Sequence, residues 1–156
     1  MKYVFDTGPL IDLFRHYYPA RFPTLWEQFH ALVLEGELIS VREVYNEINS
    51  RDDMLTSWAK KVKNKLFSEP TIEEFQFLNV IFQVQHFQAM IRKQKMLEGK
   101  PVADPFVIAR AKVLNCQVVT TEVFSENSAK IPNVCKYFSV QCTNLEGFME
   151  QEGWTF

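Results

Sequence analysis

The sequence predicts an α/β fold: one domain spanning residues 1–156, with a short, mostly parallel central sheet of four or five strands and helices on both faces. Two observations predict it. Short apolar segments rich in β-branched and aromatic residues alternate with longer helical segments, an order typical of parallel sheets. No internal repeat or long linker divides the chain, and 156 residues suffice for one substantial core.

The first half of the chain supplies two of the predicted strands. Residues 2–5 are apolar, aromatic and β-branched and adjoin a turn, which predicts a short buried strand. Pro9 can occupy the first turn of a helix, and Gly36 is placed to end a later one. The predicted elements are a strand at 2–5, a helix from Pro9, a helix from Pro23 to about Glu35, a strand at 37–40, a helix from 41 and an amphipathic basic segment at 52–67.

The second half begins with a helix start signal. Thr71 and Glu74 have the spacing of a capping box ahead of an apolar run. The elements predicted from here are a helical region to about Leu97 that breaks near His86 and ends at Gly99, a helix from Asp104 through Asn115, a strand at 116–122, a turn at Pro132, a strand at 137–143 and a closing helix at 144–153.

Composition narrows the class of protein. No apolar run approaches the length of about 20 residues that spans a bilayer, and the N-terminus lacks a secretory pattern. We therefore expect a cytoplasmic protein without a membrane segment. The three cysteines have no C-x-x-C spacing, which favours reduced thiols over a zinc site. The net charge of −2 excludes general electrostatic attraction to nucleic acid, so such binding needs a local patch or bound cations.

Two local basic runs could form such a patch. The commoner role of such a charge run, however, is a solvated helix face. The candidate residues for contact with a nucleic-acid backbone are Lys60, Lys61 and Lys63 in the first run and Arg92 and Lys93 in the second.

Acidic residues occur where the predicted strands end. Asp6 follows the first strand, and Glu122 follows the QVVTT segment of the strand at 116–122, so both are expected at the carboxyl rim, where open parallel sheets bind ligands. Glu43 and Glu47 share one face of the helix that leaves the second strand. Asp104 begins the helix that leads into the strand at 116–122.

Each acid also has a purely structural interpretation, as a turn residue, a helix cap, an exposed helix face or a loop residue. If the acids converge, their mutual repulsion calls for a compensating charge. Carboxylate oxygens favour Mg²⁺ or Mn²⁺, and such ions can bind phosphates and activate water. The positions of the acids alone therefore leave two interpretations open, separate structural roles or a metal site at the rim built from several distant segments.

At these residues the sequence resembles the PIN-domain nucleases, over the whole chain and most closely a VapC-like bacterial subfamily. The matching segments are VFDTGPLI with Asp6, VYNEI with Glu47, ADPFVIARAK with Asp104, and VVTTE with Thr120 and Glu122. The resemblance implies an endoribonuclease dependent on Mg²⁺ or Mn²⁺, with these acids as metal ligands, Glu43 as a possible further ligand, and Thr120 orienting a carboxylate or a water.

The resemblance also implies the toxin of a bacterial toxin–antitoxin pair, with an RNA substrate, an antitoxin partner and possible homodimerisation. Two residues depart from the family pattern: Glu122 stands where aspartate is usual, and Gly8 where serine or asparagine is common.

Two other functions compete with a metal-dependent nuclease. One is a catalytically degenerate PIN-like domain that binds RNA or protein. The other is a phosphotransfer enzyme with Asp6 as nucleophile, which is disfavoured because Gly8 occupies the position where that class needs a second aspartate.

Overall fold

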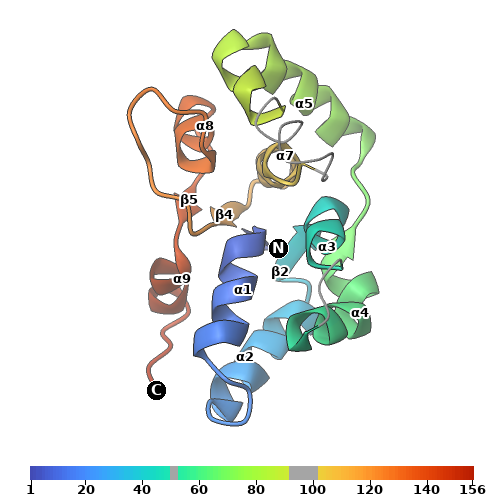
Figure 1. Cartoon of the computed structure of the whole chain (residues 1–156), viewed down its shortest axis with the longest axis vertical. Coiled ribbons are helices and arrows are strands. Elements are labelled where there is room, and N and C mark those ends of the chain that lie inside the picture. The colour runs from blue at the N-terminus through green and yellow to red at the C-terminus, as the bar shows by residue number, and fades with distance from the viewer. Residues whose placement is uncertain (50–52, 92–101) are drawn as a thin grey trace.

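The structure, a computed structural model, describes residues 1–49, 53–91 and 102–156 (Figure 1). Its sheet has five strands, all paired in parallel, in the order β3-β2-β1-β4-β5. The strands are β1 (Tyr3–Phe5), β2 (Leu38–Val41), β3 (Phe67–Ser68), β4 (Gln117–Val119) and β5 (Cys142–Thr143). The predicted α/β class with a parallel sheet is confirmed.

Helices connect and cover these strands. The described α-helices are α1 (Thr7–His16), α2 (Pro23–Leu34), α3 (Arg42–Ile48), α4 (Met54–Leu66), α5 (Ile72–Gln83), α7 (Asp104–Leu114), α8 (Ile131–Tyr137) and α9 (Leu145–Gln151), with a 3₁₀ helix, η1 (Gln85–Gln88), after α5. In the part of the chain that the structure describes, no helix is both long and apolar enough to cross a membrane.

The central strand β1 is where the winding of the sheet reverses. The chain passes outward from β1 to β2 and β3, then returns to pair β4 with the other edge of β1. Figure 1 shows α5 and α7 on one side of the strands and α1, α2 and α9 on the other. All three residues of β1 are buried, as expected of a strand covered on both faces.

Aromatic side chains form much of the core between the sheet and its helices. Phe5 makes edge-to-face contacts with Phe29 of α2 and Phe148 of α9, and Tyr3 makes a further one with Phe148. Such contacts add about 0.5–1.5 kcal/mol each beyond the area they bury. They fix the position of β1 and therefore of the residue that follows it, Asp6.

Several predicted helix boundaries are confirmed. Thr71 and Glu74 form both hydrogen bonds of a capping box. Gly36 follows α2 with a φ of +73°, a backbone conformation that glycine adopts without steric cost. The predicted break near His86 is present, because α5 ends at Gln83 and η1 follows it. The predicted continuation to Leu97 falls partly outside the described residues.

One strand in this region was not predicted, and one predicted strand is wrong. Phe67, the last residue of the amphipathic basic segment at 52–67, leaves α4 and pairs with Ser40 as the first residue of β3. Residues 137–143 were expected to form a strand after a turn at Pro132. Pro132 instead lies in the first turn of α8, where its missing N–H costs nothing, and the strand is confined to Cys142–Thr143.

Candidate active site

Asp6 lies at the carboxyl end of the central strand. Its backbone N–H donates a hydrogen bond of 3.0 Å to the carbonyl of Val119, which extends the pairing of β1 and β4. The side chain is only 6% exposed, and the Thr120 hydroxyl donates a hydrogen bond of 2.9 Å to its Oδ2. The crevice where a parallel sheet reverses its winding is the general position of ligand sites, and Asp6 stands at that point.

The surroundings of Asp6 oppose ionisation of its carboxyl group. The pKa of Asp6 is raised from 3.8 to about 7. Burial is the largest cause, the negative charges of Glu122 and Glu47 add to it, and hydrogen bonds from the Thr7 backbone and from Thr120 oppose it. Two of the acids predicted from distant segments therefore act on Asp6 electrostatically. A cation would relieve the cost of ionising a buried carboxyl among like charges.

Glu47 links the starts of two helices. Its Oε2 accepts a hydrogen bond from the Thr7 hydroxyl at the first residue of α1, and its Oε1 accepts one of 3.2 Å from the Ala103 backbone N–H. Asp104, the next residue, is the first of α7 and is partly buried. Glu47 therefore brings the backbone next to Asp104 close to Thr7, the residue that follows Asp6.

Thr120 and Glu122 complete this end of the sheet. The Thr120 side chain is buried, and its Oγ1 accepts a hydrogen bond of 3.2 Å from the Glu122 backbone N–H while it donates to Asp6. The Glu122 carboxylate accepts a hydrogen bond of 2.7 Å from the backbone N–H of Ile131, the first residue of α8. Thr120 thus holds the Asp6 carboxylate and the backbone of Glu122 in a fixed relation.

Gly8 stands where the PIN-domain nucleases that the sequence resembles commonly have serine or asparagine, and the structure supplies a steric reason for glycine here. The hydroxyl oxygen of Thr121 occupies the place that a Cβ on Gly8 would need, and Thr121 Cγ2 and Cβ would lie 3.0 and 3.1 Å from it. A side chain at Gly8 would therefore require the Thr121 side chain to shift or the two segments to move. Thr121 puts a hydroxyl beside the first turn of α1, a contribution that the sequence alone did not indicate.

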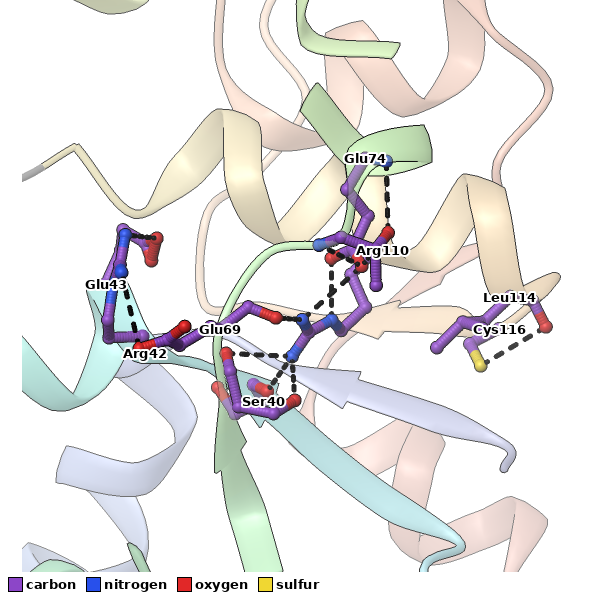
Figure 2. Close-up of polar contacts among 10 residues, drawn as sticks. Ser40, Arg42, Glu43, Glu69, Glu74, Arg110, Leu114 and Cys116 are labelled. Atoms are coloured by element: carbon purple, nitrogen blue, oxygen red, sulfur yellow. Dashed lines mark hydrogen bonds and ion pairs between the residues drawn. The ribbon is translucent and has the colours of Figure 1, made fainter. Parts of the chain in front are cut away.

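Glu43 is held in a different environment from Glu47. It is 4% exposed, its Oε1 lies 3.3 Å from Nη2 of Arg42, and its Oε2 is a buried oxygen without a hydrogen-bond partner among the described residues (Figure 2). Burial raises the pKa of Glu43, and the charges of Arg42 and Arg110 oppose that shift. Because Glu47 and not Glu43 is among the charges that act on Asp6, Glu47 fits the role of second-segment ligand better.

Arg110 is a buried arginine whose importance the sequence did not reveal. It is 2% exposed, and Nε donates to Oε1 of Glu74 at 2.7 Å. Its other donors bond the backbone carbonyls of Ser40, Ser68 and Glu69, at 2.7, 3.2 and 2.7 Å (Figure 2). The guanidinium group therefore ties α7, which carries Asp104, to the ends of β2 and β3 and to α5.

The predicted basic residues are divided between the described and undescribed parts of the chain. Lys60, Lys61 and Lys63 are exposed on α4, and Lys63 Nζ lies 4.6 Å from the ring centroid of Tyr45. Lys61 lines a pocket of about 460 Å³ together with Trp58, between α1, α2 and α4. Arg92 and Lys93 lie outside the described residues, so the structure adds nothing to their prediction.

The chemistry of the donor set suits a hard divalent cation, since the side chains around Asp6 are carboxylates and hydroxyls. Within the described ranges, however, no three aspartate, glutamate, histidine or cysteine side chains already enclose a common point.

Comparisons with known proteins supplement this geometry. One solved structure, of VapBC-1 from nontypeable Haemophilus influenzae, aligns with a TM-score of 0.49 at 13% identity, covering 92% of this chain and 98% of that chain. No curated protein matches the sequence significantly. A family model described as a domain of unknown function, DUF4411, matches residues 3–156, and the chain therefore belongs to this family.

Proposed function

We propose that the protein is an endoribonuclease that depends on Mg²⁺ or Mn²⁺ and acts as the toxin of a bacterial toxin–antitoxin pair. The observation that carries the proposal is the buried Asp6 carboxyl at the switch point of the sheet. Its pKa of about 7 responds to both Glu47 and Glu122, and Thr120 holds one of its oxygens. A protein gains little stability from such an arrangement, whereas perturbed carboxylates are common at functional sites.

Asp6, Glu47, Asp104 and Glu122 would hold the metal. When bound, the ion supplies a water of lowered pKa and stabilises negative charge on the phosphate. Asp6 contributes its ionised form, so the reaction requires a proton to leave this carboxyl. Thr120 orients Asp6 through Oδ2, and Thr7 together with the Ala103 N–H orients Glu47. The resemblance to PIN-domain nucleases supports RNA as substrate, and an accessible single-stranded or loop region is the favoured target.

A second candidate is a catalytically degenerate domain that binds RNA or protein without cutting. It is favoured by the lack of a preformed group of three metal-binding side chains among the described residues. The hydrogen bonds from backbone N–H groups to Glu47 and Glu122 give both carboxylates a structural role as well. The antitoxin partner, the homodimer and the cytoplasmic location remain predictions under either function.

Cleavage of RNA distinguishes the two candidates. We expect the protein to cleave a panel of structured RNAs in the presence of Mn²⁺ or Mg²⁺ and to lose this activity in EDTA. The Asp104→Asn variant should lose at least roughly a hundredfold in rate, because it removes one charged ligand from the metal. The measurement is the initial rate of product formation on denaturing gels.

Asp12→Asn provides a matched control, since it makes the same chemical change further along α1. That variant should cleave at the rate of the wild type. Activity that persists through both chelation and the Asp104→Asn change would contradict the proposed reaction, and absence of cleavage by the wild type on every RNA would favour the degenerate domain.

A further inference from the structure

A pocket of about 550 Å³ opens beside Glu122 at the carboxyl ends of β4 and β5. Its volume lies within the range of about 300–1,000 Å³ that is usual for small-ligand sites. We propose that this pocket, defined by Glu122, Phe124, Lys136, Thr143 and Asn144, binds one nucleotide of the single-stranded RNA next to the phosphate held at Asp6. The inference rests on the proposed function and names a substrate subsite for it.

The position of the pocket follows from the sheet. Glu122 belongs both to the pocket lining and to the acids that act on Asp6. Thr143 accepts the backbone hydrogen bond of Thr120 at 3.0 Å, so the pocket floor continues the strand pairing that positions Asp6. A strand of RNA with a phosphate at Asp6 therefore has its neighbouring nucleotide within reach of the pocket.

The side chains of the pocket match the chemistry of a nucleotide. Phe124 is 45% exposed. An exposed aromatic ring is a stacking surface for a base. Lys136 Nζ lies 4.9 Å from the centroid of that ring, where an ammonium group can also meet a phosphate. The ammonium lies over one face of the ring, so a base would stack on the other face while the cation meets the backbone.

Polar groups border this aromatic surface. The Asn144 side chain caps α9 by accepting a hydrogen bond of 2.9 Å from the Gly147 N–H, and that bond uses only the amide oxygen. The amide NH₂ group and the Thr143 side chain offer hydrogen bonds to a base edge. Because stacking tolerates every base, these polar groups are the ones that could select among bases.

Binding of a short RNA in EDTA tests the pocket separately from cleavage. The probe is a fluorescein-labelled single-stranded RNA pentamer, and its dissociation constant is measured by fluorescence anisotropy. We expect Phe124→Ala to weaken binding roughly tenfold, because removal of one stacking ring typically has an effect of this order. Lys136→Gln should reduce the slope of log Kd against log salt concentration by about 0.7, the value for one phosphate contact.

Matched controls lie elsewhere on the surface. Phe75 of α5 is 47% exposed, and Lys2 precedes β1 at the opposite end of the strand, so Phe75→Ala and Lys2→Gln should bind the pentamer like the wild type. Melting temperatures verify that all four variants fold. If Phe124→Ala and Lys136→Gln bind like their controls, the subsite is wrong even where RNA is cleaved. If they weaken binding while no RNA is cleaved in Mn²⁺, the subsite stands and the proposed nuclease activity fails.

Discussion

In EDTA, the free energy of unfolding of the wild type should fall as the pH rises from about 4 to 7, relative to that of Asp6→Asn. The Asp6 carboxyl keeps its proton up to a pKa of about 7 in the folded chain, whereas the unfolded chain releases it near 3.8. The folded state thus binds more protons in this window, and raising the pH favours unfolding. The contribution of Asp6 to the free energy of unfolding is fully present below pH 3.8 and is lost once the pH has passed 7. The difference is on the order of 4 kcal/mol.

Urea denaturation of both proteins across this pH range measures the effect. Asparagine has the shape of aspartate and can still accept the hydrogen bond from Thr120, but it carries no titrating proton. The two proteins should therefore have similar stabilities at pH 4, and the variant should be the more stable one at pH 8. Parallel curves for the two proteins would show that Asp6 ionises normally and would contradict the description of the site.

The Arg110→Met substitution should cost about 3–5 kcal/mol of stability. It removes the charge partner of the Glu74 carboxylate, whose side chain is only 2% exposed, and so leaves a buried charge unpaired. It also removes the donors to the carbonyls of Ser40 and Glu69. Breaking one side of a buried, hydrogen-bonded pair has a large cost because the remaining charge and carbonyls are not rehydrated.

Lys112→Met is the matched control, since Lys112 lies two positions further along α7 and its bond to the Phe138 carbonyl is exposed. It should change stability by less than about 0.5 kcal/mol. The double variant Arg110→Met/Glu74→Met should recover part of the loss, because no unpaired charge remains. A cost below about 1 kcal/mol for Arg110→Met alone, measured in urea, would refute the assigned role.

Local pattern accounts for the parts of the fold that were predicted correctly. The first strand at 2–5, the capping box at Thr71 and the glycine after α2 each depend on a few neighbouring residues. The two-residue strand β3 was missed because its hydrogen bonds go to a strand distant in sequence. Helix α8 was missed although Ile131, Val134 and Cys135 are buried at helical spacing, because Pro132 was interpreted as a turn.

Chain order predicts which acidic residues follow the strands and therefore lie at the carboxyl end of the sheet. The charges of Glu47 and Glu122 act on Asp6 in the structure, and the role of these three residues as metal ligands stays a prediction. The choice between Glu43 and Glu47 needs three dimensions, because both lie on one helix face and only the folded chain brings Thr7 and Ala103 to Glu47. Burial of Arg110 and the contact of Thr121 with Gly8 also depend on segments that meet only in the folded chain.

Manganese binding tests the central claim most directly. The melting temperature of the metal-stripped wild type is measured at pH 8 with and without Mn²⁺, alongside Asp6→Asn and Asp12→Asn. A cation that binds only the folded state stabilises it, so Mn²⁺ should raise the melting temperature of the wild type and of Asp12→Asn, and the gain should vanish in Asp6→Asn. An unchanged melting temperature of the wild type, or an equal rise in Asp6→Asn, would contradict a metal site built on Asp6.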